Sequence, residues 1–239
     1  MGAAFLELGP APKEEGYTVS GNWASEVLAR RECLPAPVGT RSLLPEDMKP
    51  MTETQVCADE CRLVAFYSGA SPDDRGRRLA DIQAWGFDEL EHTHDYIQWL
   101  FPLRKRSPFN PSAPVLDAEA VAAFRSRQDL RDAFVRSLAT MLHFYGFKLD
   151  GPGDEPEVRC SEQFEARVTN WMTAGNHNHL RITRILACTR TIGFSRHAVA
   201  FFRALQEVYW SEAQARSHGI SEESFSFWKS AAGLGKPDR

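Results

Sequence analysis

The pattern of hydrophobic and polar positions changes near residue 58. Residues 1–57 contain six prolines and many turn-forming residues with little periodicity, which predicts a poorly ordered N-terminal arm with one short helix around residues 22–31. From about residue 58 to residue 232, apolar positions recur at the three- and four-residue spacing of helices. We therefore expect a flexible arm over 1–57, one helical domain over 58–232 and a short tail over 233–239.

Capping residues divide this domain into roughly six to eight helices. Asp88 with Glu91 has the spacing of a capping box, and the helix it opens is predicted to run to Pro102. Asp117 and Ser221 are N-cap candidates for two further helices. Other helices are expected over residues 129–146, 161–171, 178–191 and 197–216, with a surface loop over 150–158. No strong hairpin signal is present, so the predicted fold class is all-α.

The longest of these helices has a clear core face. Its apolar residues recur on one side of the helix and predict the buried positions Leu130, Phe134, Leu138, Met141, Leu142 and Tyr145. Gly146 is expected to end it, because glycine readily adopts the left-handed conformation common after a helix.

His92 and His94 form the first of two His-x-His pairs. On a continuous helix over 88–101, His94 lies on the core face with Leu90, Ile97 and Phe101. Two residues that are two positions apart on a helix diverge, so the pair cannot chelate one ion. No Cys or His pair has the spacing of a zinc motif either. We therefore expect no metal site and no cofactor.

On the same helix, His92 lies with Tyr96 and Trp99 on the face opposite His94. A helix that is apolar on two faces is typical of the centre of a bundle, where both faces are buried. Alternatively, the second face is an exposed aromatic surface that contacts a ligand.

The second pair, His177 and His179, precedes an arginine-rich stretch. The buried face is predicted to be Ile182, Ile185, Leu186 and Thr189, and the other face carries His177, Arg181, Arg184 and Cys188. Residues 166–206 contain no acid and six arginines, namely Arg167, Arg181, Arg184, Arg190, Arg196 and Arg203. This pattern predicts either a docking surface for an anion near a helix N-terminus or arginines paired with acids such as Glu89, Glu91 and Asp95.

Composition narrows the function classes. The chain has 239 residues, is 43% hydrophobic and carries a net charge of −4, so it is no polycation that coats nucleic acid. It has neither a membrane span nor a secretory signal, and five cysteines at scattered spacings predict reduced thiols in a soluble, intracellular protein. No serine-nucleophile elbow, P-loop or dinucleotide fingerprint occurs, so no catalytic residue is predicted. Whether the chain is an enzyme is left open, with the balance against it.

Four segments resemble the N-terminal region of the opioid growth factor receptor family. In chain order they are LEHTHDYIQWLFPL from residue 90, FNPSAPVL from 109, MLHFYGFKL from 141 and NWMTAGNHNHLRITRIL from 170. The resemblance covers roughly residues 61–202. Besides residues already considered, it places His94, Gln98, Phe101 and Pro102 in one family motif and Asn170, Asn178 and Thr183 in another.

The resemblance implies a receptor for the pentapeptide Met-enkephalin, cytoplasmic or nuclear and peripheral at the nuclear envelope. We therefore expect a peptide- or protein-binding module in which aromatic side chains meet the peptide's rings and a guanidinium meets its carboxylate. The candidate ligand-binding residues are His92, Tyr96, Trp99, Trp171, His177, Arg181 and Arg184. The alternative partner is a phosphorylated ligand or nucleic acid on the arginine-rich helix face.

Overall fold

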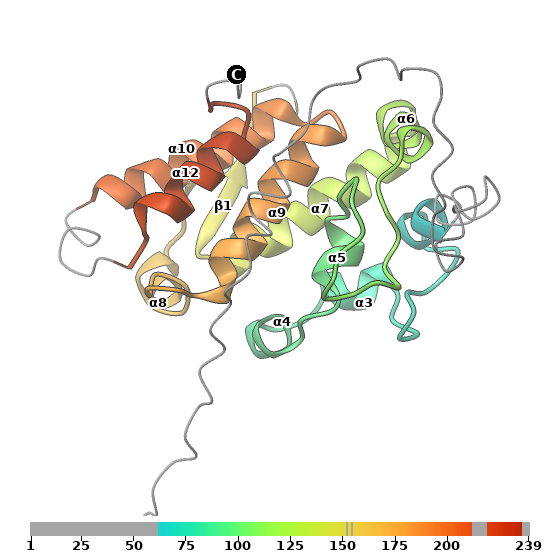
Figure 1. Cartoon of the computed structure of the whole chain (residues 1–239), viewed down its shortest axis with the longest axis horizontal. Helices are drawn as coiled ribbons and strands as arrows, with labels where there is room; N and C mark the ends of the chain where they lie inside the picture. The colour runs from blue at the N-terminus through green and yellow to red at the C-terminus, as the bar shows by residue number, and fades with distance from the viewer. Residues whose placement is uncertain (1–61, 152, 154, 212–218, 236–239) are drawn as a thin grey trace, which may run out of the picture.

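The computed structural model describes residues 62–151, 153, 155–211 and 219–235 (Figure 1). The predicted arm over 1–57, its short helix and the start of the domain over 58–61 lie outside these residues. So do residues 236–239 of the predicted tail.

The prediction of an all-α fold is confirmed, since helices surround one core and are accompanied by a single small hairpin in the described residues. The helices are residues 62–67, α3 (Leu79–Gln83), α4 (Phe87–His92), α5 (Ile97–Leu100), α6 (Ala118–Ser126), α7 (Gln128–Phe144), α8 (Phe164–Val168), α9 (His177–Thr191), α10 (Ser195–Trp210) and α12 (Glu222–Ala231). None of the described helices is both long and apolar enough to cross a membrane.

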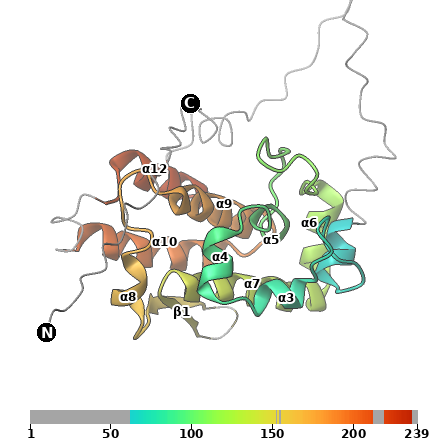
Figure 2. The same cartoon turned by 90° about the horizontal axis from the view of Figure 1, so that it is seen from below.

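Helix α9 is the centre of the domain. Helices α10 and α12 pack on one flank of it, and the segment from α4 to α5 covers another (Figures 1 and 2). The predicted core face of α9 is buried, but so is nearly every other residue from Asn178 to Thr189. The second face, which the sequence predicted either to dock an anion or to pair with acids of other helices, is therefore buried as well, because α9 has neighbours all round.

The predicted caps and core face of the surrounding helices are confirmed. Asp117 and Ser221 accept hydrogen bonds from the backbone N–H groups of Ala120 and Ser224, and the predicted apolar face of α7 is buried. Gly146 follows α7 with φ of +89°, and a Cβ there would lie 2.8 Å from the Cα of Phe164. Glycine is thus required both for the turn and for the close packing of α8.

A β-hairpin replaces part of the predicted loop. Strand β1 (Phe147–Asp150) pairs antiparallel with β2 (Glu157–Cys160), with Phe147 opposite Cys160. The strands are four residues long and are joined by a Gly- and Pro-rich stretch rather than a two-residue turn, so neither a long alternation nor a tight turn marks them in the sequence.

The continuous helix predicted over 88–101 is wrong. Helix α4 begins after Gly86 rather than at Asp88, and it ends at His92 because Thr93 is extended, with φ of −90° and ψ of 130°. Helix α5 starts four residues later, at Ile97. The two faces predicted for one continuous helix are therefore absent from this segment. His94, predicted on the core face, is exposed.

Candidate functional site

The two His-x-His segments meet through Arg181, which holds the end of α4. Its guanidinium donates hydrogen bonds to the carbonyls of Leu90 (2.9 Å), Glu91 (3.2 Å) and Thr93 (2.9 Å). The carbonyls at a helix C-terminus have no partner within the helix, so Arg181 provides the donors that α4 lacks. Only 5% of Arg181 is exposed, and its guanidinium carbon lies 5.7 Å from the centre of the Tyr96 ring.

Arg184 plays the same role for α5. It is 8% exposed and donates to the carbonyl of Phe101 at 3.2 Å, and burial lowers its pKa to about 10. Both arginines that were candidates for ligand binding therefore contact backbone carbonyls rather than solvent or the expected carboxylates.

Asp95, one of those expected partners, is bound elsewhere. Its carboxylate contacts Arg77 at 2.7 Å and Arg75 at 3.1 Å. Burial acts to raise the pKa of Asp95, but the hydrogen bond and charge of Arg77 outweigh it and hold that pKa below its usual range. The first histidine segment is thus fixed to the preceding loop as well as to α9.

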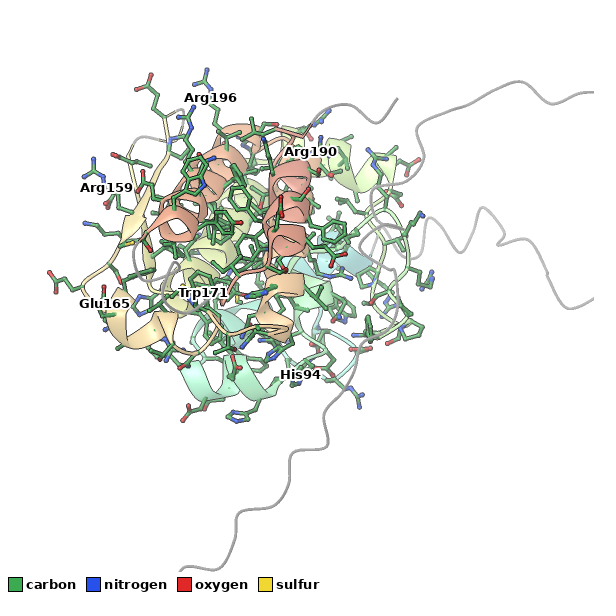
Figure 3. The ribbon with its side chains drawn as sticks, turned by 60° about the vertical axis from the view of Figure 1, so that its left-hand side comes forward. His94, Arg159, Glu165, Trp171, Arg190 and Arg196 are labelled. Atoms are coloured by element: carbon green, nitrogen blue, oxygen red, sulfur yellow. The ribbon has the colours of Figure 1, made fainter. Side chains whose placement is uncertain are left out.

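The six arginines between residues 166 and 206 do not form one surface. Besides the two buried in α9, Arg167 donates to the Phe144 carbonyl at 3.0 Å and lies over the Phe87 ring at 3.9 Å. The other three are exposed, namely Arg190, Arg196 and Arg203. Arg190 belongs to α9 and Arg196 to α10, and both lie along the upper edge of the domain in Figure 3. The anion-binding face predicted along α9 is absent from the described structure.

The candidate aromatic residues belong to the core. Tyr96, Trp99 and Trp171 are each at most 1% exposed. Each polar edge has a partner: the Tyr96 hydroxyl donates to the carbonyl of Leu90, the Trp99 indole to the carboxylate of Asp74, and the Trp171 indole to a carbonyl of the α7 terminus. The sequence predicted that Tyr96 and Trp99 are either buried in the bundle or exposed to a ligand, and in the structure they are buried. His92 is exposed and does not share a surface with Tyr96 and Trp99.

His179 is also part of the core. Its Nε2 donates to the Trp171 carbonyl at 2.9 Å, and its ring meets the edge of Trp228 at 5.4 Å. Burial lowers the pKa of His179, so the neutral imidazole is favoured.

What remains accessible between the two segments is a small polar group, which we call the Glu91–His94–His177 junction. The rings of His94 and His177 are 5.2 Å apart, and His177 Nε2 lies 3.5 Å from Glu91 Oε1. The Asn178 amide donates to the Glu91 carboxylate at 3.1 Å, so this carboxylate lies at the N-terminus of α9 where the sequence predicted an external anion. His94 is at the surface in Figure 3.

The electrostatics of the junction favour a neutral His177. Burial and the charge of Arg181 lower the pKa of His177 to about 4, although Glu91 acts in the opposite direction. The side chain of His177 is nevertheless 42% exposed, so its ring is open to a ligand. Glu91 was missed as a site residue because its spacing from Asp88 suggested a local cap.

Most of the remaining family-motif residues are buried or hydrogen-bond to the backbone of the two segments. The Gln98 amide faces the carbonyls of His94 and Asp95, 3.2 Å away, and Thr183 donates to the carbonyl of His179 at 3.0 Å. Phe101, Pro102 and Asn178 are buried, and Asn170 is exposed. No three His, Cys, Asp or Glu side chains converge on a metal-binding geometry in the described part of the chain.

Comparison with known proteins assigns the family. The model of the opioid growth factor receptor (OGFr) conserved region matches residues 66–231, which extends beyond the resemblance seen in the motifs and includes α12. The chain is 35% identical to the opioid growth factor receptor of Rattus norvegicus over 160 residues, which are 66% of this chain and 27% of that protein.

Other relatives agree. The chain is 38% identical to the opioid growth factor receptor of Homo sapiens over 126 residues, 51% of this chain and 18% of the human protein. It is 34% identical to opioid growth factor receptor-like protein 1 of Xenopus tropicalis over 160 residues, 64% of this chain and 29% of that protein. The matched region thus spans about a quarter of the relatives' length, and no solved structure matches the chain. Because the family's conserved region covers well over half of its residues, the chain belongs to the opioid growth factor receptor family.

Proposed function

We propose that this chain is a peptide- or protein-binding module and that the Glu91–His94–His177 junction is its ligand-contact surface. The observation that carries the proposal is the convergence of the two family motifs. Their buried residues bind one another, and the junction is what this arrangement leaves accessible. The names of the relatives, which describe receptors for a growth factor, support a binding role.

The chemistry of the junction suits the amino-terminal end of a short peptide. The Glu91 carboxylate can accept from a peptide ammonium group, since its contacts leave lone pairs free. The His94 and His177 rings offer aromatic faces and edges for a neighbouring aromatic side chain. A contact between the peptide carboxylate and Arg181 or Arg184, expected from the sequence, is not part of the proposal because both guanidiniums bind carbonyls.

Calorimetric titration of the full chain tests this function. The ligands are Met-enkephalin, the same peptide with an acetylated amino terminus, and a scrambled pentapeptide. We expect saturable binding of the authentic peptide and roughly tenfold or greater weakening on acetylation, because a charge-assisted hydrogen bond is lost.

The variant Glu91→Gln should weaken binding of the free peptide by a similar factor and should no longer distinguish the acetylated form. Glu89→Gln, which removes an exposed carboxylate from the same helix, is the matched control and should leave affinity unchanged. Equal binding of all three peptides, or an unchanged affinity in Glu91→Gln, would overturn the proposal.

We also propose that this binding takes place inside the cell, in the cytoplasm or the nucleus or peripherally at the nuclear envelope. Family resemblance supports that location, and the free thiols of Cys160 and Cys188 suit a reducing compartment. Imaging of the tagged chain would detect it there, whereas accumulation in the medium would contradict this location.

A further inference from the structure

A second accessible feature shares no residue with the junction. A cleft of about 560 Å³ lies between α7, the end of β1 and the start of α10, and we call it the α7–α10 cleft. Helix α7 contributes positions 128, 131, 132, 135 and 136, which recur at helical spacing and form a face distinct from its core face. Helix α7 thus packs one face on the core and lines the cleft with another.

The acidic and basic side chains of the cleft differ in whether they have hydrogen-bond partners. Asp132 accepts from the side chain of Gln128 at 2.7 Å, and Asp150 pairs with Lys148 at 3.2 Å. By contrast, neither Arg131 nor Arg136 donates a side-chain hydrogen bond to any other residue in the described ranges. Each guanidinium has five N–H donors in a planar fork that matches a carboxylate or phosphate. The donors available in this cleft therefore favour an anion.

The floor of the cleft is aromatic. The Arg131 guanidinium carbon lies 4.4 Å from the centre of the Phe194 ring, and His197 meets the same ring edge-on at 5.1 Å and 89°. Val135 and Leu149 add apolar surface beside it. An apolar or flat group that enters with the anion would be in contact with these side chains.

His197 offers a further polar group on the wall of the cleft. It is only 5% exposed and lines the cleft, and among the described residues no hydrogen bond is made by its ring nitrogens. The ring nitrogens of His197 are not enclosed, so they can be reached by a ligand that occupies the cleft. Burial, followed by the charge of Arg131, lowers its pKa, and the neutral ring has one donor and one acceptor to offer.

We propose that the α7–α10 cleft binds a small organic anion: a single carboxylate or phosphate group carried on an apolar or aromatic body. Arg131 and Arg136 bind the anionic group, and Val135 and Leu149 contact the body beside the Arg131–Phe194 pair. His197 hydrogen-bonds to a polar atom of the ligand. This site goes beyond the proposed peptide-binding function and does not depend on it.

Nuclear magnetic resonance of the full chain tests the proposal with defined probes. N-acetylphenylalanine and phenyl phosphate supply the two anions on the same ring, and N-acetylphenylalanine amide is the uncharged control. We expect both anions to shift the His197 imidazole signal saturably and the amide to bind roughly tenfold or more weakly, since hydrogen bonds to charged groups are the stronger ones. The tighter of the two anions identifies the chemical source of the natural ligand.

Arginine variants separate a built site from general attraction of anions. Arg131→Gln and Arg136→Gln should each weaken binding of the preferred anion, whereas Arg203→Gln, at an exposed arginine of α10 outside the cleft, should not. The proposal is wrong if the amide binds as tightly as the anions, if Arg203→Gln weakens binding as much as the cleft variants, or if no probe shifts His197. None of these outcomes bears on the peptide titration.

Discussion

The segment around His92 and His94 lies where the chain passes from one short helix to the next, whereas the segment around His177 and His179 begins the most buried helix of the domain. In the first, both rings are exposed. In the second, His177 is accessible and His179 is enclosed. Identical spacing therefore has different structural meanings, because the surroundings of each ring come from distant residues.

The two regions also differ in what stabilises them. Helix α9 is capped locally, since the Asn176 side chain accepts from the N–H of Asn178. At the C-terminal end of helix α4 the His92 ring contacts the Asp88 carbonyl, but the carbonyls of Leu90 and Glu91 depend on donors outside the helix, among them Arg181, about ninety residues away in the sequence. We infer that the first region is ordered by the second, and this dependence can be broken experimentally.

The largest effect is expected from Arg181→Met. This change keeps most of the side-chain volume but leaves the carbonyls of Glu91 and Thr93 without their side-chain donor, and the carbonyl of Leu90 with the Tyr96 hydroxyl alone. Each unsatisfied acceptor costs about 1–3 kcal/mol, so the loss of donors to two carbonyls should lower the free energy of unfolding by roughly 2–4 kcal/mol. Urea denaturation measures it, and Arg190→Met, at an exposed arginine of the same helix, should change stability by less than about 0.5 kcal/mol.

A smaller loss of stability should distinguish the two histidine pairs. His179→Ala removes the donor to the Trp171 carbonyl and the contact with Trp228, and should cost about 2–3 kcal/mol. His92→Ala, at an exposed ring, should stay within about 0.5 kcal/mol. Equal losses in thermal or urea unfolding would show that the two pairs are not structurally different.

Within the first pair, only one of the two histidines should affect peptide affinity. His94→Ala should weaken the affinity for Met-enkephalin about three- to tenfold, the range that an aromatic contact contributes. His92 contacts the Asp88 carbonyl of its own helix rather than His177, so His92→Ala should leave the affinity unchanged. Calorimetry on both variants decides, and a loss confined to His92→Ala would contradict the proposed surface.

The smallest effect is a change in the pH dependence of stability. The pKa of His177 is about 4 in the folded chain against an ordinary value of 6.5, so between these values the unfolded chain binds more protons. Stability from His177 is fully present above pH 6.5 and is lost as the pH falls toward 4. His177→Gln should therefore lose less stability over this range than the original chain, and a stability difference that does not vary with pH would contradict the shift.

Local signals in the sequence were sufficient for much of the fold. The caps at Asp117 and Ser221, the turn at Gly146 and the core face of α7 depend on residues close together in the chain, and all are found in the structure. These features follow from backbone geometry and helical periodicity, which need no knowledge of tertiary contacts.

The candidate site was less predictable because long-range contacts define it. Nothing near Thr93 indicates that a helix should end there, since the donor to its carbonyl is Arg181. Glu91 was assigned to a local cap, yet its carboxylate contacts Asn178. The sequence identified the two segments that meet, but not which side chains would be enclosed by the contact.

The most direct test of the account follows the imidazole signals of the chain by nuclear magnetic resonance while Met-enkephalin is added. We predict that His94 and His177 shift together and saturate at the same peptide concentration, while the enclosed His179 does not shift. Saturable binding that leaves both rings unmoved would contradict the claim that the two family motifs form the ligand-contact surface.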